Sequence, residues 1–171
     1  RILFELIADA PKPTIAAING PAVAGGCELA LACDLRVASD RAFFGLPEAK
    51  RGMGANFASV VLPRLLPRAI ALEMLFTGEP LPVAEAARWG LVNRAVAPDE
   101  VQSAAAELAQ AIAANAPVSV RRIKEMAVKS ATLPLAAAVR LDVGPNPYLS
   151  EDRKEGVAAF VEKRTPVWRN R

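Results

Sequence analysis

The sequence contains no histidine, and this absence excludes several kinds of active site at once. Catalytic groups that use an imidazole as the base, Ser-His-Asp and Cys-His alike, are ruled out. Most transition-metal sites also depend on imidazole ligands. The two cysteines, Cys27 and Cys33, are too few for a disulfide framework or a zinc site. Both stand in apolar sequence, and we expect reduced core residues of a cytoplasmic protein with no bound metal.

Aromatic residues make up only 5% of the chain, and neither sign of charge is concentrated in it. The formal net charge is +3, from 21 Lys and Arg against 18 Asp and Glu. Nucleic-acid binding would favour a concentrated basic face with aromatic side chains for stacking, and the sequence has neither. The mild positive excess suits an anionic small ligand, although such an excess is more often a solvated surface.

No secretory signal peptide is recognised, and the sequence begins at Arg1 instead of Met. We expect the chain to be the later part of a longer protein. The apolar stretch over residues 13–33 is long enough to be considered as a membrane span. Its prolines, glycines, asparagine and single glutamate favour a buried strand, turn and helix instead, so no membrane association is predicted.

The first part of the chain has the pattern of a small α/β layer. Short β-branched or apolar runs bounded by turn residues predict strands, and longer runs with apolar residues on one side predict helices. The predicted strands are 14–18, 34–38 and 42–45, and the predicted helices are 2–8 and 25–33. The second of these helices is apolar on nearly all faces and is therefore expected to be central.

From residue 57 onward the chain is mostly helical in pattern. The predicted helices are 57–66, 67–76, 83–89, 99–115, 117–130, 133–142 and 151–164, with one strand over 91–96. Pro63 is expected to kink or interrupt the first of them, and Ser150 is expected to cap the last. The predicted organisation is a partial mixed core over residues 1–78 and a mostly helical region over residues 79–171 of the same unit.

Glu28 is the only charged residue between Pro13 and Cys33. A carboxylate in apolar surroundings is costly to ionise, which suits a general acid or base, although a buried structural pair explains it equally well. Gly25 and Gly26 precede it in what looks like a strand-to-helix turn. The free N–H groups of a helix start would then lie beside the carboxylate and hold a developing negative charge.

A second carboxylate, Glu48, follows the short run over residues 42–45 and precedes a glycine-containing loop. By itself it reads as a solvated carboxylate paired with Lys50 or Arg51. The loop after it, with Gly52 and Gly54, has the composition of a segment that wraps a ligand. Together with Glu28 it forms a candidate catalytic pair.

Several segments, in chain order, resemble the crotonase superfamily, the enoyl-CoA hydratases and isomerases. They are residues 15–20 (IAAING), 24–34 (AGGCELALACD), 44–48 (FGLPE), 75–78 (LFTG), 87–93 (ARWGLVN), 150–152 (SED), 155–156 (EG), 160–164 (FVEKR) and 166–168 (PVW). The likeness is nearest to the hydratases of the carnitinyl-CoA dehydratase type. It implies an α/β fold: the later part of a crotonase-like ββα spiral core, followed by a helical C-terminal region that builds trimers.

The resemblance implies addition of water to the double bond of a 2-enoyl-CoA thioester. Glu28 and Glu48 match the two catalytic glutamates of the family, and the N–H of Gly25 matches one donor to the thioester oxygen. Two carboxylates that flank one water can deprotonate it and protonate the α-carbon, and preorganised donors can hold the enolate oxygen. Family isomerases commonly keep only the second glutamate, so the presence of both favours a hydratase. Coenzyme A would be part of the substrate, and no separate cofactor is predicted.

The resemblance also implies substrate-binding positions, which are Gly26, Gly54, Phe160 and Lys163. The segment after Glu48 is one residue shorter than the Pro-Gly-Ala-Gly-Gly-like segment of many hydratases, so the water-holding N–H belongs to Gly54 or Ala55. Phe160 and Lys163 match positions near the adenine end of coenzyme A, although a core Phe and a surface Lys explain them equally well. The other oxyanion donor and much of the coenzyme A surface would precede Arg1, and we expect the isolated chain to be inactive.

The partners implied are an acyl-CoA substrate and further copies of the chain, in a homotrimer or a homohexamer. Three alternatives to a hydratase stay open within the family: an isomerase, a decarboxylase and a thioesterase, since the fold supports several enolate reactions. A fourth belongs to another class, a non-catalytic acyl-CoA-binding or assembly subunit.

Overall fold

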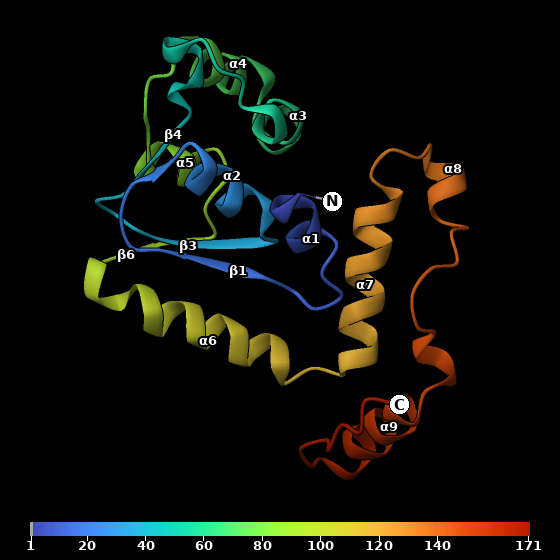
Figure 1. Ribbon diagram of the computed structural model, residues 1–171. Helices are drawn as coiled ribbons and strands as arrows, with labels where there is room; N and C mark the ends of the chain where they lie inside the picture. The colour runs from blue at the N-terminus through green and yellow to red at the C-terminus, as the bar shows by residue number, and fades with distance from the viewer. Residues whose placement is uncertain (1) are drawn as a thin grey trace. The chain divides into compact units, whose positions relative to one another are not determined.

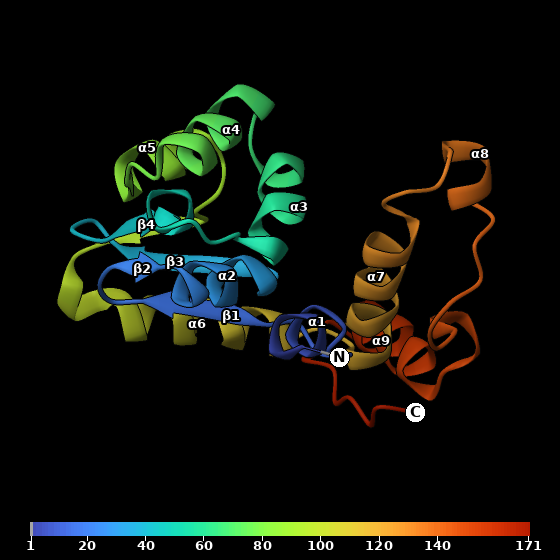
Figure 2. The same cartoon turned by 45° about the horizontal axis from the view of Figure 1, so that its top comes forward.

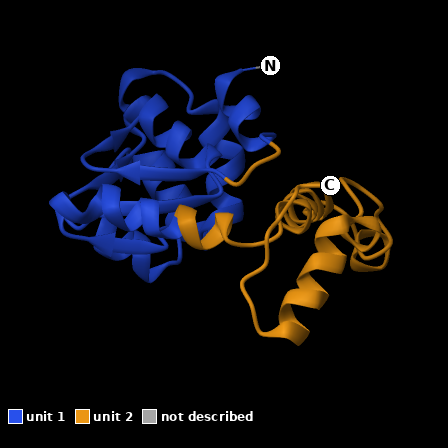
Figure 3. Ribbon diagram, turned by 90° about the horizontal axis from the view of Figure 1, so that it is seen from below, with its two compact units in different colours: residues 1–10, 14–108 blue, residues 11–13, 109–171 orange. Residues whose placement is uncertain are grey.

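The computed structural model describes residues 2–171, which form two compact units (Figure 3). The first contains the residues up to Ala10 together with Thr14–Leu108, and the second contains Pro11–Pro13 and Ala109–Arg171. The first unit continues past residue 78 because two later strands, β5 (Leu81–Pro82) and β6 (Arg94–Val96), pair with earlier strands. Which part of the chain carries which function within these units stays a prediction.

The strands of the first unit form two small sheets (Figures 1 and 2). In one sheet, β1 (Ile15–Ile18), β3 (Leu35–Ser39) and β6 (Arg94–Val96) are all parallel, as expected for strands joined by crossovers. In the other, β4 (Phe43–Gly45) pairs in parallel with β2 (Ala22–Val23) and antiparallel with β5 (Leu81–Pro82). The sequence did not predict β2 and β5, because two residues are too few to show any periodicity.

Helix α2 (Gly25–Ala32) lies at the centre of the first unit, as its uniformly apolar sequence predicted. It packs against β2, against α1 (Leu3–Ala8) and against α3 (Asn56–Leu65). The rings of Phe4 and Phe57, from the two outer helices, lie 5.4 Å apart between their centroids. Figure 1 shows α2 and α6 (Val101–Ala113) on opposite sides of the β1–β3–β6 sheet.

Helices α3, α4 (Arg68–Thr77) and α5 (Val83–Arg88) gather on one side of β4 (Figure 2). Pro63 was expected to kink or interrupt the first of these helices; it does not interrupt α3, which continues from Asn56 to Leu65 with Pro63 inside it. Proline so near the end removes one hydrogen bond from the last turns, and the buried Leu62 holds the helix in place.

The second unit contains α7 (Pro117–Ser130), α8 (Leu135–Ala138), the 3₁₀ turn η3 (Pro147–Leu149) and α9 (Glu151–Glu162). Ser150 caps α9 as predicted, since its Oγ accepts the N–H of Arg153 at 3.1 Å. The helix predicted over 133–142 shrinks to the four residues of α8, none of them buried, because a helix without packing partners is marginal. Within residues 2–171, no helix has the length and apolar character needed to span a bilayer.

Candidate active site

The turn between β2 and α2 holds its backbone in a rarely populated conformation. Ala24 has φ 52° and ψ −124°, a backbone conformation that residues other than glycine seldom adopt. Hydrogen bonds at both ends hold it there: its N–H donates to the Gly45 carbonyl at 2.9 Å, and its carbonyl accepts the Glu28 N–H at 3.0 Å. The strain therefore lies at the residue before the first helical N–H groups, as is common at functional sites.

Gly25 and Gly26 begin α2 and are exposed. A Cβ added at Gly26 would meet nothing within 4 Å, and one at Gly25 would reach only the ring of Phe4 at 4.0 Å. The N–H groups of a first helical turn have no acceptor inside the helix. The predicted glycine turn is thus open on its outer side, where an incoming group can approach the N–H of Gly25.

Glu28 is buried, with 9% of its surface exposed, and its carboxylate reaches across to the next helix along the chain. Its Oε1 accepts the backbone N–H groups of Phe57 and Ala58, each at 3.0 Å. These are amides of the first turn of α3, whose N-cap residue, Ala55, has no side chain that can accept a hydrogen bond. Glu28 therefore supplies the missing cap, and the two amides stabilise negative charge on its Oε1.

Glu48 lies in the 3₁₀ turn η1 (Pro47–Arg51) and is also buried, with 9% exposed. Its Oε2 is buried and has no hydrogen-bond partner within residues 2–171. A buried carboxylate oxygen without a donor is costly, so this atom indicates a group that binds beside it. The interpretation of Glu48 as a solvated carboxylate is wrong because its side chain is buried, and Lys50 pairs with Glu79 at 2.6 Å instead.

The position of η1 depends on a close approach from α4. Gly78, at the end of that helix, has φ +63°, and a Cβ added there would lie 3.1 Å from the Pro47 Cα. Only glycine fits both the backbone angle and the space. Leu46, 1% exposed, anchors the other end of the turn in the core. Glu48 is thus carried on a short segment that is fixed from two sides.

Cys27 directly precedes Glu28 in α2. Its side chain is fully buried, and burial raises the pKa of the thiol to about 12, with further increases from the charges of Glu48 and Glu28. Both carboxylates therefore act on the same buried thiol. Glu28 lies in the first turn of α2, which begins at Gly25. The interpretation of Glu28 and Glu48 as a catalytic pair, with Gly25 as a donor, stays a prediction.

Gly54 lies in the exposed loop between η1 and α3, and a Cβ there would meet Asn56 Oδ1 at 3.0 Å. The sequence assigned this loop to ligand binding but did not identify the donors in α3. Those donors are the Phe57 and Ala58 amides, next to the loop, which hold Glu28. No side-chain pattern in a sequence marks a backbone N–H group as a donor. The predicted start of a helix after Ala55 was the one indication that free N–H groups would lie there.

Arg36 is a further residue that the sequence did not single out. It is 6% exposed, and its guanidinium donates to the carbonyls of Ala30, Cys33, Asp34 and Leu91. Burial lowers the pKa of this guanidinium. A cation at the C-terminal end of α2 complements the helix dipole and satisfies its last carbonyls. The one available signal was an arginine inside the otherwise apolar strand β3.

Phe160 and Lys163 belong to the second unit. Phe160 is 86% exposed and lines a groove of about 620 Å³ together with Tyr148, Val157 and Trp168, so its interpretation as a core residue is wrong. Lys163 is exposed and ends α9 in a left-handed conformation, with φ 55°. The predicted contact of these two side chains with a ligand stays a prediction.

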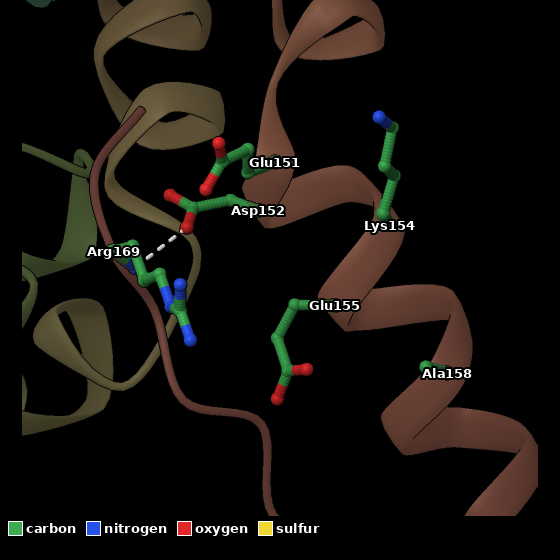
Figure 4. A pocket seen from close by; sticks show the side chains of 6 residues that line it. All are labelled: Glu151, Asp152, Lys154, Glu155, Ala158 and Arg169. Carbon is green, nitrogen blue, oxygen red and sulfur yellow. Dashed lines mark hydrogen bonds between the residues drawn. The ribbon is translucent and has the colours of Figure 1, made fainter.

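A hollow of about 400 Å³ beside α9 is lined by charged side chains (Figure 4). Asp152, 1% exposed, accepts the N–H groups of Arg169 and Asn170 at 2.7 and 3.1 Å. Glu155 accepts the N–H of Val167, and its pKa falls to about 2, chiefly through its hydrogen bonds with Arg164. These carboxylates fasten the last residues of the chain to α9, so the hollow is a by-product of that attachment.

Comparison with known proteins places the chain in a family. The model of the enoyl-CoA hydratase/isomerase family matches residues 2–171. The chain is 44% identical to carnitinyl-CoA dehydratase of Salmonella typhi over 172 residues, which cover 96% of the chain and 66% of that protein. It therefore spans slightly less than two thirds of the length of this relative.

Solved structures agree in fold. Enoyl-CoA hydratase from Mycobacterium tuberculosis H37Rv superposes with a TM-score of 0.89 at 40% identity, covering 96% of this chain and 67% of that one. The enzyme of the same name from Bacillus anthracis gives a TM-score of 0.93 at 35% identity, covering 98% and 66%. The predicted α/β crotonase-like fold with a helical C-terminal part is confirmed. The chain belongs to the crotonase superfamily, in the enoyl-CoA hydratase/isomerase family.

Proposed function

We propose that the full-length protein is an enoyl-CoA hydratase-like lyase, which reversibly adds water to the double bond of a 2-enoyl-CoA thioester. The observation that carries the proposal concerns two buried glutamates: Glu28 has one oxygen held by two amides, and Glu48 has one oxygen with no donor among residues 2–171. A water molecule that donates to one carboxylate and accepts from a protonated other would satisfy this arrangement. The similar proteins named for enoyl-CoA hydration and carnitinyl-CoA dehydration support the same reaction class.

In the proposed reaction, Glu28 takes a proton from water while the water oxygen bonds to the β-carbon. The two amides that donate to its Oε1 hold that carboxylate in a fixed orientation. The electrons of the carbon–carbon double bond move to the thioester oxygen, and the N–H of Gly25 stabilises the enolate that forms. Glu48 then gives its proton to the α-carbon, which yields the 3-hydroxyacyl-CoA. Transfer of the proton from Glu28 to Glu48 through a water molecule restores the starting state.

The test is hydration of crotonyl-CoA by the full-length protein, followed by the loss of absorbance of the conjugated thioester. Glu28→Gln and Glu48→Gln should each lower kcat by about a hundredfold or more, since each removes a proton-transfer group. Lys50→Gln is the matched control, because Lys50 belongs to the same turn and its exposed ammonium pairs with Glu79. Wild-type rates in either glutamate variant would refute the assigned pair.

Phe160 and Lys163 are proposed to contact the adenine end of coenzyme A. The support is the exposure of the Phe160 ring at the wall of an apolar groove, a place suited to stacking on a planar group. Phe160→Ala should raise KM for crotonyl-CoA severalfold and leave kcat nearly unchanged. Val161→Ala, on the next residue and 73% exposed but outside the groove lining, is the control.

Oligomerisation, location and cofactor use are proposed together with the activity. We expect a homotrimer or homohexamer, supported by large exposed apolar side chains in the second unit, such as Leu135 and Val139. Light scattering of the purified full-length protein would give its mass directly. We also expect a cytoplasmic protein that needs no added cofactor, so dialysis against a chelator should leave the hydration rate unchanged.

A further inference from the structure

Arg36 joins the C-terminal end of α2 to a second segment of the first unit. It is the second residue of β3, the strand that follows α2, and it is buried. Nη1 of its guanidinium donates to the carbonyls of Ala30 and Cys33 at 3.2 and 2.8 Å. Carbonyls at the end of a helix have no partner inside the helix, so the guanidinium supplies donors that this end of α2 lacks.

The segment over residues 91–93 holds Arg36 from the other side. Nε of the guanidinium donates to the carbonyl of Leu91 at 2.5 Å, and Leu91 is itself fixed in the core with 1% of its surface exposed. The backbone of Arg36 meets the same segment, because its N–H donates to Asn93 Oδ1 and its carbonyl accepts the Asn93 N–H, both at 2.9 Å. The segment therefore gives the guanidinium a fixed support.

The opposite end of α2 carries two groups of the proposed reaction. Gly25 begins the helix, and Glu28 lies in its first turn. From Gly25 to Cys33 the helix rises about 12 Å, and so short a helix moves as one body. Its residues are apolar on nearly all faces, and hydrophobic burial is non-directional, so packing alone fixes its position along its axis poorly. The hydrogen bonds at its two ends therefore decide where it stands.

We propose that Arg36 is a positioning residue of the active site: by fastening the last carbonyls of α2 to the 91–93 segment, it sets the positions of the Gly25 N–H and the Glu28 carboxylate at the other end of the helix. This inference rests on the proposed hydratase function. Arg36 is buried under α2 and acts only through that helix. A planar guanidinium that donates to two segments at once fixes direction as well as distance, which a single hydrogen bond does not.

The test measures hydration of crotonyl-CoA by the full-length protein with Arg36→Met and Arg36→Lys. Arg36→Met removes every donor and should lower kcat about tenfold or more, with KM changed less than about twofold, because misplaced groups affect the chemical step. Arg36→Lys keeps the charge and one ammonium, which reaches one of the two segments but not both. It should lower kcat at least about threefold, and less than Arg36→Met does.

Val101→Ala is the control for a loss of stability alone. Val101 is fully buried at the start of α6, on the opposite side of the sheet from α2 (Figure 1). Truncation of its side chain leaves a cavity and lowers the unfolding midpoint at a distance from α2. Its kcat should stay within about twofold of wild type below that midpoint. An equal fall in kcat for Val101→Ala and Arg36→Met would show that Arg36 acts through stability only.

A second measurement is independent of turnover. The Phe57 and Ala58 amides donate to Glu28, so their hydrogen exchange reports whether that carboxylate is in place. Exchange of these amides should be at least about fivefold faster in Arg36→Met and within about twofold of wild type in Val101→Ala. If Arg36→Met does not fold, Arg36→Lys still decides, because a loss of less than about threefold in its kcat contradicts the inference.

The inference and the proposed function fail in different ways. Wild-type kcat in Arg36→Met would overturn the positioning role, while inactive Glu28→Gln and Glu48→Gln variants still uphold the hydratase. A wild-type protein that hydrates no enoyl-CoA would overturn the function, and the role of Arg36 in it, even if Arg36→Met speeds the exchange of the Ala58 amide.

Discussion

The Glu28 carboxylate accepts the backbone N–H of Ala58 at 3.0 Å, thirty residues further along the chain. One side chain thereby joins the first turn of α2 to the first turn of α3. The same oxygen also accepts the N–H of Phe57, so the residue proposed as the base is a structural cap as well. The structural and catalytic interpretations of Glu28, which the sequence left open, are therefore compatible.

This double role predicts that two substitutions at Glu28 differ in stability. Glu28→Ala leaves the two α3 amides without their acceptor and should lower the free energy of unfolding by about 1–3 kcal/mol. Glu28→Gln keeps a carbonyl oxygen in reach and should lose less than half as much, while losing activity. Urea unfolding followed by circular dichroism measures both, and equal destabilisation by Ala and Gln would contradict the capping role.

Arg36 should be a large contributor to the stability of the first unit. Arg36→Met removes a buried donor and leaves the carbonyls of Ala30, Cys33 and Leu91 without it, which should cost at least about 2 kcal/mol of unfolding free energy. The exposed Arg41→Met is the control and should cost less than about 0.5 kcal/mol. Comparable unfolding midpoints for the two variants would show that the guanidinium does not hold α2.

Gly78 and Gly90 both have positive φ, and comparing alanine substitutions at the two positions separates the effect of backbone strain from the effect of displacing the site. Gly78→Ala and Gly90→Ala both place a Cβ on a left-handed residue, at φ +63° and +80°, and each should lose about 1 kcal/mol. Only at Gly78 does the Cβ meet a neighbour, the Pro47 Cα at 3.1 Å, and only there should η1 and Glu48 move.

We therefore expect Gly78→Ala to lower kcat about tenfold and Gly90→Ala to leave it within about twofold. Steady-state kinetics with crotonyl-CoA and thermal unfolding, measured on the same samples, separate the two effects. Equal kcat values for the two variants would mean that η1 is not held by the end of α4.

Acid should release the end of the chain from α9 at an unusually low pH. Hydrogen bonds from Arg164 hold the pKa of the Glu155 carboxyl at about 2, below its ordinary value of 4.5. A depressed folded-state pKa means that this stabilisation is fully present above about pH 4.5 and is lost as the pH falls towards 2.

Trp168 reports this release, because its Nε1 donates to the Ala114 carbonyl at 2.8 Å. In a Trp89→Phe background, its fluorescence should stay constant down to pH 4.5 and change between pH 4.5 and 2. Glu155→Gln should remove that titration. A transition near pH 7, or one that persists in Glu155→Gln, would show that Glu155 does not fasten the terminal segment.

Much of the fold followed from patterns over a few consecutive residues. The strands around Val37 and Phe44, the central helix that carries Glu28, and the Ser150 cap were predicted because apolar periodicity and capping chemistry are local. The two-residue strands β2 and β5 and the length of α8 were not, because they depend on whether distant segments pack against them. Pro63 was tolerated inside α3 for the same reason.

The sequence by itself determined that Glu28 and Glu48 stand in the right context and that Gly25 begins a helix beside them, because residue identity and spacing are sufficient for these statements. Only the tertiary structure decided what each carboxylate contacts. The hydrogen bonds from the Phe57 and Ala58 amides to Glu28, and those from the Arg36 guanidinium to the carbonyls of α2, are contacts between backbone groups and distant side chains. Backbone N–H and carbonyl groups are the same at every residue, so no pattern of side chains announces which of them will meet.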